Sequence, residues 1–92
     1  MNRTEAKTIL RHLAKYGRLA YSDHSREQML KRNVSTEDIL FVLMWGKIES
    51  LKKDKSRQNF KCEIKGKDLD GENLTVVAAI EDDSETVVIT VF

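Results

Sequence analysis

The first segment of the chain, from Thr4 to Tyr16, carries its apolar residues at helical spacing. One side of the predicted helix holds Lys7, Arg11 and Lys15, and the other holds Ala6, Ile9, Leu10, Leu13 and Tyr16. The pattern therefore predicts an amphipathic helix that packs through its apolar arc. Gly17 follows at the position where a left-handed C-terminal cap is expected.

A second helix is predicted to begin at a Ser22-Asp23 cap and to run to about Arg32. Its apolar side is thin, because only Met29 and Leu30 are apolar.

A third helix is predicted after Ser35, which is an N-cap residue followed by acids in the first turn. The run ILFVLMW comes next and ends at Gly46. Seven apolar residues in a row also fit a buried strand, because periodicity cannot separate the two. The cap and the terminal glycine favour a buried helix.

The residues after Gly46 change to β-branched types and to alternation. Four strands are predicted, at about 47–53, 58–66, 74–81 and 85–92. In the second of these, Lys61, Glu63 and Lys65 alternate with Phe60, Cys62 and Ile64. Turn residues at Asp70-Gly71 and at Asp82-Asp83-Ser84 predict a meander of hairpins. The last strand, TVVITVF, is apolar on both faces, which predicts a paired strand covered by a helix.

The predicted order of elements indicates an α+β fold, with two to three N-terminal helices packed on a four-stranded antiparallel sheet. The 92 residues suffice for one modest core, so we expect a single domain over residues 1–92. No internal repeat is visible.

The composition is that of a globular protein, with 40% apolar and 34% charged residues. No apolar run approaches the roughly 20 residues of a membrane-spanning helix, and the N-terminus lacks the apolar region of a signal peptide. The single cysteine, Cys62, agrees with a reducing compartment and is expected to pack as a small hydrophobe. A cytoplasmic location is the expectation.

The formal net charge of +1 hides a strong asymmetry along the chain. Residues 1–67 contain all 16 Lys and Arg against 8 acids, whereas residues 68–92 contain 7 acids and no base. This division predicts one surface suited to an anion and another that is not. The simpler alternative is that the acids only keep the last turns soluble.

Most sequence signatures of catalysis are missing from the chain. It has no phosphate-binding loop, dinucleotide fingerprint, serine-nucleophile elbow or paired-cysteine zinc spacing. His12, His24 and Cys62 are too few and too scattered for a convincing zinc site. We therefore expect neither a metal nor another cofactor.

The second predicted helix carries the most suggestive polar pattern. His24, Gln28 and Arg32 follow one another at intervals of four residues, which places them in a row about 6 Å apart along one flank. A neutral imidazole could act as a base, and an arginine could grip a phosphate bidentately. By spacing alone, a structural role is favoured, with His24 packed locally and Arg32 solvated.

Basic side chains on the second predicted strand offer a further candidate surface. Lys61 and Lys65 share one face, and the preceding segment LKKDKSRQ adds Lys52, Lys53, Lys55 and Arg57. Such a face could follow an RNA backbone, with Arg26 and Gln28 of the second helix as further contacts. An ordinary solvated face would look the same. Thr90 is an unusual polar residue in an apolar strand, which strand propensity also explains.

The stretch from Tyr21 to Gly46, YSDHSREQMLKRNVSTEDILFVLMWG, resembles the characteristic pattern of the bacterial domain-of-unknown-function family 4258, and the ending VVITVF is similar to that family's closing strand. The individually telling residues are His24, Met29, Arg32, Ser35, Gly46 and Thr90. Residues 1–20 lie outside the resemblance. Two positions depart from the pattern, since Gln28 stands where the family usually has Arg and Asn33 where it usually has Gly.

The resemblance implies a toxin of a toxin–antitoxin module, of the RelE, MqsR and BrnT type. Toxins of this type are metal-independent ribonucleases. It implies RNA or a ribosome and a neighbouring antitoxin protein as partners, and no membrane. In such an enzyme His24 would deprotonate a ribose 2′-hydroxyl, Arg32 with Lys61 or Lys65 would neutralise charge, and Thr90 would orient the phosphate. The alternatives are a non-enzymatic RNA- or protein-binding module and a catalytically silent relative, the latter favoured by Gln28.

Overall fold

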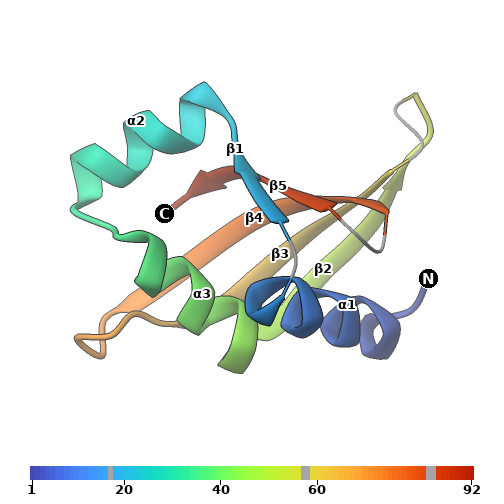
Figure 1. Cartoon of the computed structure of the whole chain (residues 1–92), viewed down its shortest axis with the longest axis horizontal. Coiled ribbons are helices and arrows are strands. Elements are labelled where there is room, and N and C mark those ends of the chain that lie inside the picture. Colours follow the sequence, from blue (N-terminus) through green and yellow to red (C-terminus); the bar gives the residue numbers. More distant parts are fainter. Residues whose placement is uncertain (17, 57–58, 83–84) are drawn as a thin grey trace.

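The fold is an α+β arrangement of helices on a curved sheet. In a computed structural model, residues 1–16, 18–56, 59–82 and 85–92 are described. These residues form the helices α1 (Arg3–Lys15), α2 (Asp23–Arg32) and α3 (Thr36–Trp45). The strands are β1 (Arg18–Tyr21), β2 (Lys47–Asp54), β3 (Asn59–Lys67), β4 (Asn73–Asp82) and β5 (Glu85–Val91), and they form one sheet in the order β1-β5-β4-β3-β2 (Figure 1).

The first helix confirms the predicted amphipathic pattern. Ala6, Leu10 and Leu13 are buried, and the side chain of the N-cap residue Asn2 accepts a hydrogen bond from the main-chain N–H of Glu5 at 2.8 Å. Tyr16 was predicted on the apolar arc, and this was wrong, because α1 ends at Lys15 and the Tyr16 side chain is 75% exposed. The predicted cap at Gly17 lies outside the described residues.

The third helix is buried, as its cap predicted, and the strand alternative is wrong for this segment. The Ser35 hydroxyl accepts from the main-chain N–H of Asp38 at 3.1 Å, while the Asp38 carboxylate accepts from the main-chain N–H of Ser35 at 2.9 Å. These two bonds form a capping box. The helix ends at Gly46, as predicted, and this residue is in an extended conformation with a φ of −74°.

The sheet has five strands and is mixed, which corrects the predicted four-stranded antiparallel sheet. Strands β2 to β5 form the expected antiparallel meander. Strand β1 adds a parallel edge, with Arg18 opposite Glu85 and Tyr21 opposite Val88. Four residues are too few to show alternation, and their partner lies at the other end of the chain, so no local pattern predicts this pairing.

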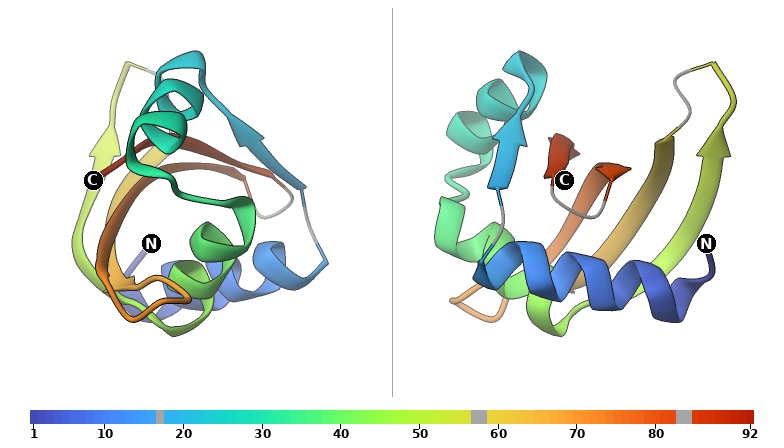
Figure 2. Two further views of the ribbon diagram at one scale, coloured as in Figure 1. Left: turned by 90° about the vertical axis from the view of Figure 1, so that its left-hand side faces the viewer. Right: turned by 45° about the vertical axis from the view of Figure 1, so that its right-hand side comes forward.

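Helices α1 and α3 cover one face of the sheet, which curves around them (Figure 2). Between these layers lies the core, which includes Leu10, Ile39, Val42, Leu43, Cys62, Ile64, Val76, Ala78, Val88 and Val91. Cys62 is fully buried, as expected of a small hydrophobe. Strand β5 is paired on both sides, as predicted, and helix α2 packs beside it.

No helix of the described residues lies over the other face of the sheet (Figure 2). We call this the open face, and the strand register assigns to it Ser50, Lys52, Lys61, Glu63, Lys65, Val77, Ala79, Val87 and Thr90. Within the described parts of the chain, no helix is both long and apolar enough to cross a membrane.

Candidate nucleic-acid interface

The start of α2 is fastened to the free edge of β5 by Ser22. Its main-chain N–H donates to the carbonyl of Val88 at 3.0 Å, and its hydroxyl donates to the carbonyl of Ile89 at 2.8 Å. The same hydroxyl accepts from the main-chain N–H of Ser25 at 3.0 Å and so caps the helix. Because β1 ends at Tyr21, α2 continues along the part of β5 that β1 leaves unpaired.

Ser25 is fully buried, and it defines the side of α2 that faces β5. Successive residues of a helix are rotated by about 100°, so Arg26 lies on one flank and His24 on the other. Tyr21 is paired with the core residue Val88, so its side chain points to the helix-covered side of the sheet. The Arg26 guanidinium lies 5.9 Å from the centre of the Tyr21 ring, so Arg26 is on that side as well. The flank with His24 therefore lies on the side of the open face.

The predicted row of His24, Gln28 and Arg32 is present, because α2 is a continuous helix over these residues. It begins on the His24 flank and turns by about 80° over eight residues, so that Arg32 points close to the direction of Ser25 at the far end of the helix. His24 and Arg32 are exposed, and Gln28 is half-buried. Within the described residues, no hydrogen bond or ion pair involves any of the three side chains. The row is therefore available to a ligand, but no residue that the structure describes forms a hydrogen bond that orients the His24 imidazole. Arg26, which was grouped with this row as a candidate contact, is on the opposite flank.

Thr90 lies on the open face, in the part of β5 that α2 borders. It is directly opposite Val77 of β4, which is opposite Glu63 of β3. Lys61 and Lys65 each lie two residues from Glu63 along β3, one on either side. With strands about 5 Å apart and residues rising about 3.3 Å, each lysine Cα is roughly 12 Å from that of Thr90. The structure thus brings Thr90 and both lysines to one face.

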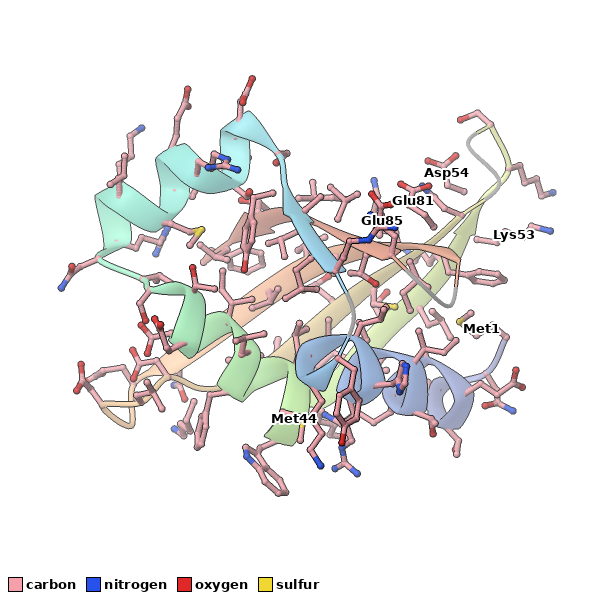
Figure 3. The ribbon with its side chains drawn as sticks, in the orientation of Figure 1. Met1, Met44, Lys53, Asp54, Glu81 and Glu85 are labelled. Carbon is pink, nitrogen blue, oxygen red and sulfur yellow. The ribbon has the colours of Figure 1, made fainter. Side chains whose placement is uncertain are left out.

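Acidic side chains occupy one end of the open face. Asp54, Glu81 and Glu85 gather at the end where β2 turns into β3 (Figure 3). The side-chain amide of Asn59 donates to the Glu81 carboxylate at 3.3 and 3.4 Å. The other acidic segment, the turn at residues 68–72, is held toward α3 by a bond from Leu69 to Asp38. An anion on the open face is therefore favoured toward the lysines and away from the acidic end.

A shallow hollow of about 340 Å³ indents the acidic end of the open face, beside the N-cap residue of α2. Its lining includes Ser22, Asn59, Lys61 and Ile89, together with the carboxylates of Asp54 and Glu81. Asn59 is only 3% exposed, and its Oδ1 atom has no hydrogen-bond partner in the described structure. It can accept a hydrogen bond from a ligand, for example from the amino group of a base. The sequence reasoning missed Asn59, because an asparagine at the start of a strand is typical of a turn.

The remaining candidate residues are not brought together. His12 is exposed on α1, and Cys62 is buried in the core, where burial raises the pKa of its thiol to about 11. In the part of the chain that the structure describes, no three His, Cys, Asp or Glu side chains are placed to hold a metal ion. The candidate site therefore consists of cationic side chains, the His24 imidazole and the Thr90 hydroxyl.

Comparison with known proteins identifies a family for this chain. Residues 21–92 match the sequence profile of a domain of unknown function (DUF4258), so the chain belongs to this family. The match begins at the last residue of β1 and leaves α1 outside. No curated protein and no solved structure matches significantly.

Proposed function

We propose that this member of the DUF4258 family binds single-stranded RNA across the open face of its sheet and cleaves it without a metal ion. The observation that supports the proposal is that His24, the first residue of the row with Gln28 and Arg32, lies on the flank of α2 next to the uncovered face that carries Thr90, Lys61 and Lys65. The exposed cations are suited to phosphates, and the shallow surface is suited to an extended strand.

The chemistry follows from the one imidazole in this group. His24 would take the proton from a ribose 2′-hydroxyl, and the 2′-oxygen would attack the adjacent phosphorus. The bond from phosphorus to the 5′-oxygen would break, and that oxygen would leave as a hydroxyl after taking up a proton. Arg32 would neutralise the charge that develops on the phosphoryl oxygens, with Lys61 or Lys65 holding neighbouring phosphates and Thr90 orienting the reacting one.

The test is cleavage of a 5′-labelled single-stranded RNA by the purified protein in EDTA. We expect fragments that end in a 2′,3′-cyclic phosphate, and no cut where the scissile nucleotide is 2′-deoxy. Because contaminating ribonucleases give similar products, His24→Ala and Arg32→Ala proteins purified in parallel are essential. Arg26→Ala is the matched control, since it removes an exposed arginine from the other flank of the same helix. Cleavage that survives both His24→Ala and Arg32→Ala would contradict the residue assignment.

The second candidate function is RNA or protein binding without catalysis. It is favoured by the exposed His24 imidazole, for which no residue of the described structure supplies an orienting hydrogen bond. It is also favoured by Gln28, which offers an amide where the family pattern has a guanidinium. RNA binding by the pure protein with no cleavage, also when ribosomes are added, would select this function.

A protein partner of the antitoxin type belongs to the same proposal. It would be the product of a neighbouring gene and would suppress both RNA binding and growth inhibition. Titration calorimetry of the purified pair tests this part separately from the RNA assays.

A further inference from the structure

Helix α1, which lies outside the family match, carries a row of four cations. Arg3, Lys7, Arg11 and Lys15 follow one another at intervals of four residues, so they form a stripe about 18 Å long. The only acid in this helix is Glu5. A stripe of this kind is more than the helix needs for solubility, because its other polar positions already face solvent.

Three of these cations reach the end of α3 and the start of β2. Lys7 donates to the main-chain carbonyls of Leu43 and Gly46, and the Arg11 Nε donates to that of Met44 at 2.9 Å. Arg3 donates to the carbonyl of Glu49 at 3.0 Å. These neutral acceptors position the cations but do not cancel their charge. No ion pair to them is present in the described part of the chain.

The stripe borders a hollow of about 440 Å³ between α1 and the start of β2. Four cations line it, and its lining contains no acidic side chain: Arg3, Thr4, Lys7, Thr8, Arg11, Gly46, Lys47 and Ile48. Burial, together with the nearby charge of Arg11, lowers the pKa of Lys7. A bound anion would relieve this repulsion between like charges.

Two exposed aromatic rings lie next to the stripe, and each is close to one of its cations. Trp45 is 67% exposed, and the Arg11 guanidinium lies 5.8 Å from its ring centre. Tyr16 is 75% exposed, and the Lys15 ammonium lies 5.8 Å from its ring centre. Exposed aromatic rings among cations are the combination that binds the bases and phosphates of single strands.

Lys47 connects this surface with the open face of the sheet. It lines the hollow beside α1, and it is directly opposite Lys65 across the β2–β3 pair. Opposite residues of an antiparallel pair point to the same face. A strand of RNA that leaves the hollow can therefore pass over the edge strand β2 from Lys47 to Lys65 without crossing the acidic end.

We infer that the α1 stripe, Trp45 and Lys47 form a second contact surface for single-stranded RNA, which extends the open-face site around the edge of the sheet. The inference rests on the proposed function only in taking RNA as the ligand, since it requires no cleavage. A single strand is favoured over an acidic protein because the two exposed rings offer stacking, which a carboxylate surface would leave unused.

Trp45 is the single tryptophan of the chain, so its fluorescence reports on this surface alone. The probe is a 12-nucleotide single-stranded RNA of mixed sequence. The fluorescein-labelled strand measures binding by anisotropy, and the unlabelled strand measures quenching of the Trp45 fluorescence.

The variants leave Lys7 and Arg11 unchanged, because these two side chains hold the end of α3. They are Trp45→Ala, Trp45→Phe and the double variant Lys15→Gln/Lys47→Gln. Lys53→Gln is the control: although Lys53 belongs to the basic segment before β3, the register pairs it with Phe60, on the face opposite to Lys61 and Lys65, and it lies at the far end of β2 (Figure 3).

RNA should quench Trp45, and Trp45→Ala should weaken binding about 5- to 100-fold, with recovery in Trp45→Phe. The double variant should reduce the slope of log K against log salt by about 1.4, or about 0.7 for each lysine, whereas Lys53→Gln should leave it unchanged. RNA binding without quenching and without these changes would overturn the inference while leaving the proposed function intact. Equal quenching by poly-glutamate would overturn it in favour of an acidic protein. Absence of any RNA binding would overturn both.

Discussion

The carboxylate of Asp38 accepts a hydrogen bond from the main-chain N–H of Leu69 at 2.9 Å, and this contact ties the first turn of α3 to the turn between β3 and β4. The other oxygen of the same carboxylate accepts from the main-chain N–H of Ser35. These bonds lower the pKa of Asp38, the bond from Leu69 most and the bond from Ser35 next. One side chain thus caps a helix and holds a distant turn.

This arrangement predicts a stability that depends on acid pH. The pKa of Asp38 is lower in the folded state than in the unfolded state. The contribution of Asp38 to the free energy of unfolding is therefore fully present above the unfolded pKa of about 4, and it is lost as the pH falls through the folded pKa. Asp38→Ala should cost about 1–3 kcal/mol of unfolding free energy at pH 7, and less at pH 2 to 3. Urea unfolding at several pH values measures this. Glu37→Ala, an exposed neighbour in the same turn, should change stability by no more than about 0.5 kcal/mol.

Gly46 is predicted to be required for close packing, not for its backbone conformation. A Cβ atom there would lie 2.6 Å from the carbonyl oxygen of Val42 and 2.9 Å from that of Lys65, both main-chain atoms. Gly46→Ala should therefore destabilise the fold by about 1–3 kcal/mol. Gly71 provides the comparison, because it has open space around it but a φ of +85°.

Gly71→Ala should cost about 1 kcal/mol through its backbone conformation, and Gly71→Asn should recover part of that loss. Gly46→Asn should be worse than Gly46→Ala, since the added atoms have nowhere to go. Thermal and urea unfolding of the four proteins distinguish the two causes. If asparagine were tolerated at Gly46 as well as at Gly71, packing would not be the reason for this glycine.

Cys62 is predicted to be chemically inert in the folded protein. Burial raises the pKa of its thiol to about 11, and the residue is fully covered by the core. Labelling with a disulfide reagent at pH 8 should therefore be slow in buffer and fast in denaturing urea. The contribution of the protonated thiol to stability should be constant below about pH 8.5, the unfolded pKa, and fall as the pH rises toward 11. Rapid labelling under native conditions would show that β3 opens readily.

The two flanks of α2 are predicted to differ in function although both carry exposed polar side chains. His24→Ala should lower any RNA cleavage at least about 100-fold, as expected for the loss of a general base. Arg32→Ala should lower both cleavage and the salt dependence of RNA binding. Arg26→Ala should leave cleavage within about twofold. Circular dichroism spectra of all three variants verify that α2 is retained.

Sequence patterning accounts for most of the local structure. The caps at Ser22 and Ser35 and the alternation of β3 predicted their elements closely, because capping and amphipathic burial act over a few residues. The row of His24, Gln28 and Arg32 follows from helical spacing alone.

The tertiary structure decided the rest, because it depends on contacts between distant parts of the chain. The parallel pairing of β1 with β5 turns a predicted four-stranded sheet into a five-stranded one and places α2 along the edge of β5. Helical rotation already separates Arg26 from His24, and the placement of α2 decides which side of the sheet each of them faces. Lys47 lines the hollow beside α1 and also lies opposite Lys65. It can do both only because β2 is the edge strand. The sequence by itself determined which residues carry charge and in which helix or strand they lie; only the packing of distant elements determined which of those charges meet.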